Sequence, residues 1–328
     1  MDTATYITQD QKEEGPLEVT TTTMTSSNNI SNNNNSSSGP ITADGVMPQK
    51  KFYRQRAHCN PLAHNDSFQY PLVVEDTSWL QEHFPNLPEA ARRPTVLDCG
   101  CGFGGLTVAL AKALPDQVIM GLEIRAKVTE YVRLRIVALR QEASAAGAGG
   151  HDYNNASVMR TNSMKFLPNF FPQASLIKMF FCFPDPHFKR KNHGRRIISL
   201  RLLSEYAYLL QPEHGRLYCI TDVLELHHWH VAQCSAHPLF RRLSEAEIHH
   251  DPCVELMQHE TEEGKKVSKL GGDNKKGEKY YCVYQRIPNA NIEHLHAGNF
   301  FTTPTLDEEE NDNDNNNNNN NKEESTKE

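Results

Sequence analysis

Short apolar stretches alternate with longer stretches of helical spacing through the middle of the chain. The short stretches are rich in β-branched and aromatic residues, which is typical of buried strands, and the longer ones repeat apolar residues every three to four positions. The pattern predicts strands at 95–99, 117–123, 157–161, 175–182 and 216–221, a strand-rich section ending at 279–286, helices at 78–83, 104–114, 125–141, 195–210 and 223–236, and a flexible linker at 143–150. This alternation indicates an α/β fold with a doubly wound, mostly parallel sheet.

The first predicted strand leads into a turn with four glycines. The stretch 96–105 reads Val-Leu-Asp-Cys-Gly-Cys-Gly-Phe-Gly-Gly. A turn without Cβ atoms lets a ligand approach the backbone closely. Gly100, Gly102 and Gly105 satisfy the dinucleotide-binding fingerprint, and the acidic Glu123 follows about 20 residues later. The turn therefore predicts a nucleoside site without saying which nucleoside is bound.

Asp98 favours one class of nucleoside over another. A dinucleotide would place its pyrophosphate at the N-terminus of the following helix, where a carboxylate two residues before the first glycine would repel it. S-adenosylmethionine has no phosphate, and Asp98 could attract the ammonium group of its methionine end directly or through water. We therefore expect S-adenosylmethionine as the cofactor, and an NAD-dependent oxidoreductase remains the alternative from the residues alone.

The two ends of the chain differ from its middle in composition. Residues 1–46 are rich in Thr, Ser and Asn, and residues 289–328 are acidic and rich in Asn, so we expect disordered tails around one domain at 47–288. The tails carry net charges of −5 and −8, which leaves +6 for the domain in a chain of −7 overall. A basic domain favours a polyanionic partner. Neither a signal peptide nor an apolar run long enough to cross a bilayer is recognisable, so no membrane is expected.

The thiols and imidazoles do not suggest a metal site. The eight cysteines form no Cys-x-x-Cys pair, and we expect reduced thiols in an intracellular protein. The spacing of Cys99 and Cys101 is wrong for a zinc knuckle. His227, His228 and His230 do not share one helix face, so a mostly exposed cluster is expected.

Polar residues follow the predicted strands, where ligands bind in a parallel sheet. Glu123 follows the second strand and can accept both hydroxyls of a ribose, or it can pair with Arg125 or Lys127. Asn162 follows the third strand and can recognise the adenine edge, or it can simply cap a helix.

The stretch 180–196 holds a rigid acid followed by cations. Pro184 and Pro186 restrict the backbone on both sides of Asp185, which follows the most apolar strand. The basic residues that follow suggest a phosphate-binding rim beside a base pocket, and the simpler alternative is a turn with a solvated basic face. They are Lys189, Arg190, Lys191, Arg195 and Arg196.

At this point the sequence resembles a known family, the tRNA (guanine-N7)-methyltransferases, and in particular their eukaryotic catalytic subunits. The resemblance covers residues 48–288 and lies in several motifs: Asp98-Cys-Gly-Cys-Gly-Phe-Gly-Gly105, Gly121-Leu-Glu-Ile-Arg125, Asn162-Ser-Met, Leu167-Pro-Asn-Phe-Phe171, Phe183-Pro-Asp-Pro-His-Phe-Lys189, Glu205-Tyr-Ala-Tyr208, Ile220-Thr-Asp-Val-Leu-Glu-Leu-His227 and Thr261-Glu-Glu-Gly-Lys-Lys266. It implies the sheet of a Rossmann-like class I methyltransferase with seven strands.

The resemblance also assigns roles to individual positions. It implies that the S-adenosylmethionine site is lined by Gly100, Glu123, Arg125, Asn162, Ser163 and Cys182. Asp185 matches the catalytic acid, and Thr261 and Glu263 match a motif that closes over the cofactor. The implied substrate is a guanine in the variable loop of tRNA, the implied partner is a noncatalytic WD-repeat subunit in a heterodimer, and the implied location is the nucleus. A nonenzymatic RNA-binding protein is the remaining alternative.

Overall fold

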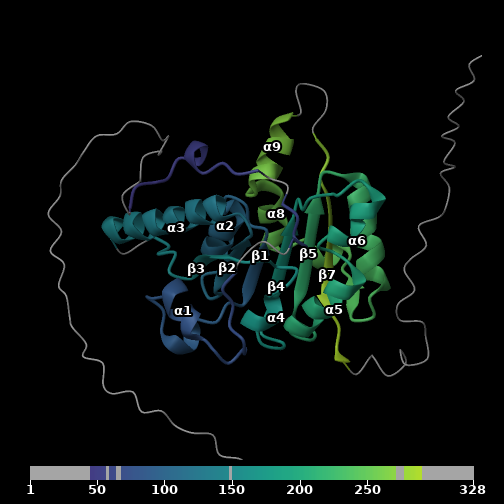
Figure 1. Ribbon diagram of the computed structural model, residues 1–328, viewed down its shortest axis with the longest axis horizontal. Helices are drawn as coiled ribbons and strands as arrows, with labels where there is room; N and C mark the ends of the chain where they lie inside the picture. Colours follow the sequence, from purple (N-terminus) through teal and green to yellow (C-terminus); the bar gives the residue numbers. More distant parts are fainter. Residues whose placement is uncertain (1–44, 57–58, 64–67, 148–149, 271–276, 290–328) are drawn as a thin grey trace, which may run out of the picture. The chain divides into compact units, whose positions relative to one another are not determined.

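A computed structural model describes residues 45–56, 59–63, 68–147, 150–270 and 277–289. Within these ranges one sheet has seven strands in the order β3-β2-β1-β4-β5-β7-β6 (Figure 1). The strands are β1 Val96–Cys99, β2 Ile119–Glu123, β3 Ala156–Arg160, β4 Lys178–Cys182, β5 Arg216–Thr221, β6 Phe240–Arg242 and β7 Tyr280–Arg286. Strands β1 to β5 pair in parallel, and β7 runs antiparallel to β5 and β6. The predicted doubly wound, mostly parallel sheet is confirmed.

The strand order reverses in the middle of the sheet. The chain adds β2 and β3 on one side of β1 and then returns to place β4 on the other side. At such a switch point the loops after β1 and β4 diverge, and a crevice opens beyond the carboxyl ends of the strands. The fold therefore places the glycine turn after β1 next to the segment Phe183–His187 after β4.

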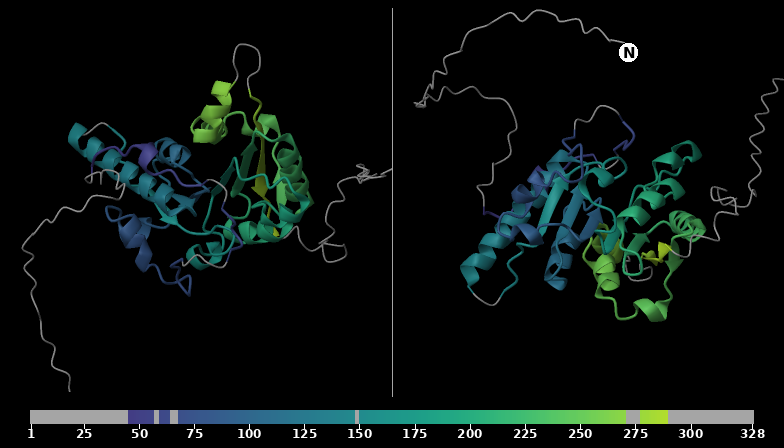
Figure 2. Two further views of the ribbon diagram at one scale, coloured as in Figure 1. Left: turned by 45° about the horizontal axis from the view of Figure 1, so that its top comes forward. Right: turned by 90° about the horizontal axis from the view of Figure 1, so that it is seen from below.

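Helices cover both faces of the sheet (Figure 2). Their bounds are α1 Ser78–His83, α2 Gly105–Ala113, α3 Ala126–Ala146, α4 Leu167–Phe170, α5 Leu200–Leu209, α6 Leu224–Ala236, α7 Glu245–Ile248, α8 Pro252–His259 and α9 Glu262–Leu270. One hydrophobic core lies between the sheet and helices α1, α4, α5 and α6, and a second lies between the sheet and helices α2, α3, α7 and α8. Because both faces are covered, every residue of β1 and β2 is buried.

Strand β4 shows how one strand serves both cores. Phe181 packs against Tyr206 on one face, with ring centroids 4.8 Å apart, and Phe180 stacks on Tyr218 on the other face at 4.4 Å. All four rings are fully buried. Burying a Phe side chain stabilises the fold by about 1.5–3 kcal/mol. The two phenylalanines thus fix the strand whose end positions Asp185.

Several predicted boundaries are wrong. Helix α3 continues to Ala146, so half of the predicted linker is helical, as the good helix formers Ala143, Ala145 and Ala146 favour. Helix α5 begins only at Leu200, because a 3₁₀ helix at Arg190–Arg195 precedes it. The predicted strand-rich last section contains β6 and β7 but also α7, α8 and α9.

The histidines at 227–230 were predicted to be mostly exposed, and the structure confirms this only in part. His228 is exposed, but His230 is 1% exposed and lies on the inner face of α6. Burial lowers its pKa to about 3, with smaller effects from His227 and Arg196. His230 is therefore a neutral core residue.

The predicted tails at 1–46 and 289–328 lie outside the described residues except at their inner ends. Among the described residues, no helix combines the length and apolar character needed to cross a membrane. No group of three or more metal-ligating side chains occurs in the same ranges. The free thiols include Cys99, Cys101, Cys182, Cys219, Cys234, Cys253 and Cys282.

Candidate active site

A cavity of about 210 Å³ opens at the carboxyl ends of β1 to β4. Eight of the sequence-predicted site residues line it: Gly100, Glu123, Arg125, Asn162, Ser163, Cys182, Asp185 and Arg195. They come from four separate segments of the chain, and the switch point of the sheet brings them together. The remaining predicted residues do not line this cavity.

The floor of the cavity is the glycine turn. Gly100 has a φ of 78°, in the left-handed region that favours glycine, and no atom lies within 4 Å of the position that a Cβ would occupy. The space above Gly100 is therefore open to a ligand. Gly105 has a different role, because a Cβ there would lie 2.2 Å from the carbonyl oxygen of Glu260. Its missing side chain lets the connection between α8 and α9 pack onto the turn.

The predicted attraction of Asp98 for the cofactor's ammonium group, directly or through water, stays a prediction, and the structure places the carboxylate behind the cavity surface. The Asp98 carboxylate is 1% exposed, accepts a hydrogen bond of 2.7 Å from Thr107 Oγ1, and is absent from the cavity wall. Burial raises the pKa of Asp98 to about 6, the Thr107 hydrogen bonds oppose this rise, and the charge of Glu123 adds to it. Asp98 thus connects the end of β1 to α2 through its hydrogen bond with Thr107. Gly102 likewise shapes the turn without lining the cavity.

Glu123 lies in the cavity wall and is bound by Arg125. Glu123 Oε1 accepts hydrogen bonds from the backbone N–H of Arg125 at 2.9 Å and from its Nε at 3.1 Å, and Oε2 accepts from Nη2 at 2.8 Å. The Glu123 side chain is 4% exposed and that of Arg125 is 16% exposed. The ion pair considered as an alternative to ribose binding is therefore present, in the same place where a ribose would bind.

The end of β3, the strand next to β2, supplies further polar groups to the cavity wall. Asn162 Nδ2 donates to the carbonyl oxygen of Pro61 at 2.6 Å, and its Oδ1 accepts from the N–H of Met164 at 3.0 Å. Asn162 therefore forms a turn over the next two residues and does not cap a helix, because α4 begins at Leu167 with Phe166 as its N-cap residue. A contact of Asn162 with adenine stays a prediction. Beside it, the hydroxyl of Thr161 is buried without a hydrogen-bond partner among the described residues. Thr161 lines the cavity, so a bound ligand can supply that partner.

The acid after β4 is held in a constrained turn. Phe183 and His187 have φ values of 50° and 46°, unusual for residues with side chains, and they bracket Pro184-Asp185-Pro186. Asp185 Oδ1 accepts from the N–H of His187 at 3.4 Å, and Oδ2 lies 3.9 Å from His187 Nδ1. The Asp185 side chain remains 29% exposed, so this carboxylate is fixed in direction and open to a ligand.

The thiol of Cys182 lies beside this turn. Burial raises its pKa well above the usual value, and the charge of Asp98 adds to the effect. Cys182 is therefore a neutral wall residue and not a nucleophile.

The basic segment divides into exposed and buried cations. Lys189, Arg190 and Lys191 are exposed, and Arg195 is half-buried at the cavity. Arg196, in contrast, is 2% exposed.

The prediction that Arg196 binds phosphate is wrong because its charge is used internally. Its Nε donates to the carbonyl oxygen of Pro186 at 2.9 Å, its Nη2 to Glu225 at 2.7 Å, and its guanidinium lies 4.7 Å from the ring centre of Trp229. These contacts anchor the Asp185 turn to α6. Arg196 therefore supports the candidate catalytic acid from behind.

The C-terminal motif lies near the glycine turn and outside the cavity wall. Thr261 is buried at the start of α9, where its hydroxyl accepts a hydrogen bond of 2.9 Å from the N–H of Gly264. Glu263 is half-exposed and pairs with Lys266 at 2.9 Å. Direct contacts of these residues with a cofactor stay a prediction.

Sequence reasoning missed several residues of the wall. Cys59 and Pro61 belong to a segment before the domain's first strand, His187 and Ile197 follow Asp185, and Thr161 precedes Asn162. Thr161 and His187 could have been found, because each adjoins a residue already singled out. Cys59 and Pro61 carry no local signal, since only the tertiary fold brings them to β3.

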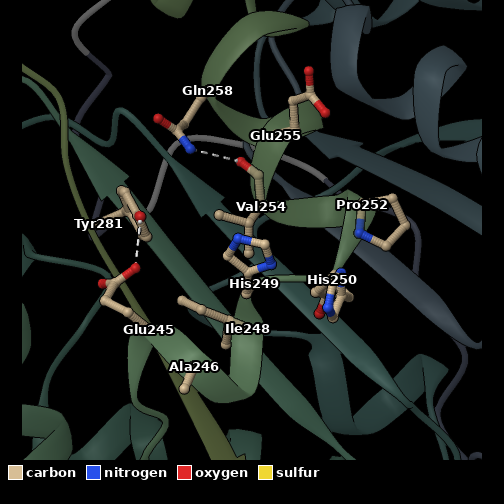
Figure 3. Close-up of a pocket in the computed structure, with 11 residues that line it drawn as sticks. Glu245, Ala246, Ile248, His249, His250, Pro252, Val254, Glu255, Gln258 and Tyr281 are labelled. Atoms are coloured by element: carbon tan, nitrogen blue, oxygen red, sulfur yellow. Dashed lines mark hydrogen bonds between the residues drawn. The ribbon is translucent and has the colours of Figure 1, made fainter.

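A larger cavity of about 790 Å³ lies elsewhere, between α7, α8 and Tyr281 (Figure 3). Some of its polar groups form hydrogen bonds with one another: Tyr281 donates to Glu245 at 3.0 Å, and Gln258 donates to the carbonyl oxygen of Val254 at 3.2 Å. It contains none of the predicted site residues. This cavity is the larger of the two, but the predicted nucleoside-binding and catalytic residues line the smaller one.

Comparison with known proteins identifies the family of the chain. The profile of a family described as "Putative methyltransferase" matches residues 92–277. The chain is 49% identical to the tRNA (guanine-N(7)-)-methyltransferase of Eremothecium gossypii over 251 residues, which cover 75% of this chain and 85% of that protein. It is 47% identical to the protein of the same name from Schizosaccharomyces pombe, over 75% of this chain and 88% of that one. With this identity over most of both lengths, the chain belongs to the family of tRNA (guanine-N(7)-)-methyltransferases.

Proposed function

We propose that this protein transfers the methyl group of S-adenosylmethionine to N7 of a guanine in the variable loop of tRNA. The observation that carries the proposal is the single cavity that joins the glycine turn and Glu123 to Asp185, with Arg195 at its rim. A nucleoside site, a fixed carboxylate and exposed cations are thereby adjacent. An NAD-dependent oxidoreductase is not supported by the family.

The residues present fit S-adenosylmethionine. The open space at Gly100 lets the cofactor approach the protein backbone, and Glu123 offers a carboxylate to a ribose. The Thr161 hydroxyl, which has no partner among the described residues, offers a hydrogen bond. When bound, the cofactor supplies a methyl group on a positively charged sulfur. Glu123, Asn162 and Ser163 would hold its nucleoside, and the neutral Cys182 would add packing.

The chain has little proton chemistry to perform in this reaction. Guanine N7 carries a lone pair and no proton, so no general base is required and alignment of the reacting groups is the main task. As the methyl group moves, positive charge develops on the purine. The fixed carboxylate of Asp185 would stabilise that charge and accept hydrogen bonds from the N–H groups of the guanine.

The cations would hold the RNA. Lys189, Arg190 and Lys191 follow Asp185 directly and are exposed, so phosphates on either side of the target base can reach them. This placement supports tRNA as the substrate in preference to a small molecule. It also separates the two binding tasks, since none of these three residues lines the cavity.

The activity is tested by incubating the full chain with tRNA and methyl-labelled S-adenosylmethionine and mapping the modified nucleoside. We expect label in 7-methylguanosine within the variable loop. Label in another base or loop would contradict the substrate assignment, and binding of NAD in preference to S-adenosylmethionine would contradict the cofactor assignment.

We also infer, from the family resemblance alone, a heterodimer with a noncatalytic WD-repeat subunit and a nuclear location. Copurification of the full chain with such a subunit and an increase in methylation on its addition would support the heterodimer. Fluorescence imaging of the tagged chain tests the location, and an exclusively cytoplasmic signal would contradict it.

A further inference from the structure

Phe188 is an aromatic residue exposed to water beside the candidate catalytic acid. It is 65% exposed, more than any other Phe, Tyr or Trp in the part of the chain that the structure describes. Single exposed apolar residues are ordinary on a protein surface, so the surroundings of the ring decide what it does.

The surroundings of Phe188 are cationic. Lys189, Arg190 and Lys191 follow it directly, and all three are exposed. Proteins that bind single-stranded nucleic acid combine cations, which attract the phosphates, with aromatic rings on which the bases stack. The three cations are the phosphate-binding residues proposed above, and Phe188 supplies the aromatic surface that they lack.

The segment that carries Phe188 is closed into a loop at its base. Arg196 Nε donates to the carbonyl oxygen of Pro186 at 2.9 Å, which joins the two ends of the segment. Within the loop, His193 Nε2 donates to the carbonyl oxygen of Phe188 at 3.4 Å, and the His193 ring meets Trp229 edge-on with ring centroids 5.3 Å apart. The backbone of Phe188 is therefore held from the protein side. A surface that is ordered before binding loses less conformational freedom when its ligand arrives.

Phe188 lies just outside the candidate active site. It follows Asp185 by three residues, so their Cα atoms are at most about 11 Å apart. Asp185 lines the cavity, and Phe188 does not. A base bound at Asp185 is therefore inside the cavity, and Phe188 is available to an adjacent nucleotide that stays outside.

The reaction creates a need for such a surface. An enzyme that acts on a base takes this base out of its stack, and the neighbouring base then loses a stacking partner. An aromatic ring on the protein can replace that partner, and it does so for any sequence because every base has a flat face.

We propose that Phe188 is the platform on which the nucleotide next to the methylated guanine stacks. The inference rests on the proposed function, because it takes tRNA as the substrate. Phe188 is then a substrate-positioning residue: its ring holds the RNA strand at the cavity entrance while the guanine lies at Asp185. A protein partner is the competing occupant of this surface, but the three exposed cations beside the ring favour a polyanion.

Substitutions of Phe188 test the stacking. The affinity of the full chain for tRNA is measured in the presence of S-adenosylhomocysteine for Phe188→Ala, Phe188→Leu and Phe188→Trp. The Ala and Leu variants should each bind about fivefold more weakly or worse, because both lack an aromatic face, and the Trp variant should bind at least as well as the parent. Parental affinity in the Leu variant would mean that any apolar side chain suffices and would overturn the proposal. Parental affinity in the Ala variant would also overturn it, and loss of a copurifying protein from that variant would then identify a protein-binding surface.

Two further measurements separate stacking from phosphate binding. The salt dependence of tRNA affinity should be the same in the Phe188 variants and the parent, because no charge is removed, and a flattened slope would overturn the proposal. The second measurement uses tRNA with 2-aminopurine, a fluorescent base that is quenched by stacking, on either side of the target guanine in turn. The complex with Phe188→Ala should be brighter than the complex with the parent at one of these positions. Equal fluorescence at both positions would overturn the proposal.

The matched control is Tyr208→Ala, which removes another exposed aromatic ring. Tyr208 is 47% exposed near the end of α5, and its carbonyl oxygen accepts from the N–H of Ala174, which precedes the amino end of β4. This is the edge of the sheet opposite to the cavity, so the control should bind tRNA like the parent. Failure of the proposed function would appear as a parent that does not methylate tRNA. Failure of the stacking alone would leave the parent active and the Phe188→Ala variant unimpaired.

Discussion

Replacing Glu123 by Gln tests the cofactor site with the smallest change of shape. The substitution keeps the side-chain volume, removes the charge and turns one acceptor oxygen into an N–H donor. In the ligand-free protein it breaks up a set of three hydrogen bonds from Arg125 at a carboxylate that is only 4% exposed. The unfolding midpoint should fall, because the half-buried guanidinium of Arg125 loses its charged partner and one acceptor oxygen remains for three N–H donors.

The expected loss of cofactor affinity follows from the same contacts. A hydrogen bond to a charged group contributes about 1.5–3 kcal/mol, which corresponds to roughly 10- to 150-fold in the dissociation constant. Part of this loss is offset, because three N–H groups of Arg125 already occupy the Glu123 carboxylate in the ligand-free protein. We therefore expect a result near the lower limit, about tenfold weaker binding.

Calorimetric titration with S-adenosylhomocysteine measures this value without requiring RNA. Glu130→Gln is the matched control, because Glu130 forms a similar hydrogen-bonded pair with Arg133 at 2.8 Å on the exposed surface of α3. The control should bind like the parent. If Glu123→Gln retains the parental affinity while its midpoint falls, Glu123 serves only to hold Arg125, and the ribose contact is refuted.

Three further predictions concern RNA, the cavity wall and pH. Replacing Lys189 and Lys191 by Gln should raise the KM for tRNA and flatten its salt dependence by roughly one log unit per lost phosphate contact, with cofactor affinity unchanged; an unaltered salt slope would mean that these lysines bind no phosphate. Thr161→Val should weaken S-adenosylhomocysteine binding about two- to tenfold without lowering the unfolding midpoint of the ligand-free protein, because the hydroxyl has no hydrogen-bond partner among the described residues. A fall in the midpoint with unchanged affinity would show that the hydroxyl has a structural role. Burial lowers the pKa of His83 and His237 to about 4 and of His230 to about 3, so the unfolded chain binds more protons and stability should decline as pH falls from about 6.5 towards 4. Asp98 has its pKa raised to about 6, so below pH 6 the folded protein binds one extra proton there, which opposes the loss of stability from the three histidines but is smaller than it. Equal urea midpoints at pH 7 and pH 5 would contradict the predicted dependence of stability on pH.

Local chemistry made the centre of the site predictable. The glycine turn and the Pro-Asp-Pro segment each follow an apolar strand, and parallel strands deliver their carboxyl ends to one edge. Knowing the strands is therefore enough to bring Gly100, Glu123, Asn162 and Asp185 together. The structure places all four in one cavity wall.

These differences have a common physical cause, which is side-chain contacts that the apolar pattern does not report. Arg195 and Arg196 look alike in the sequence. Arg196 is buried because it pairs with Glu225 and packs on Trp229, two residues about 30 positions away in the chain. Asp98 was expected to attract the cofactor's ammonium group directly or through water, and the sequence did not reveal that Thr107 on α2 donates a hydrogen bond to its buried carboxylate. Periodicity reports which face of an element is apolar and does not report which partner a polar group will find.

The most direct test of the account concerns Asp185. Single-turnover methylation of tRNA is measured for Asp185→Asn at saturating S-adenosylmethionine, with folding and cofactor affinity checked on the same sample. The substitution removes a carboxylate that the constrained turn holds open to the cavity, and it turns one acceptor into a donor facing the guanine N–H groups. Loss of one preorganised electrostatic contact typically lowers the rate by about 10²–10³-fold, and we predict a decrease of this size with cofactor affinity preserved. A rate within about threefold of the parent, less than about 1 kcal/mol on the barrier, would show that Asp185 only shapes the turn and would contradict the proposed mechanism.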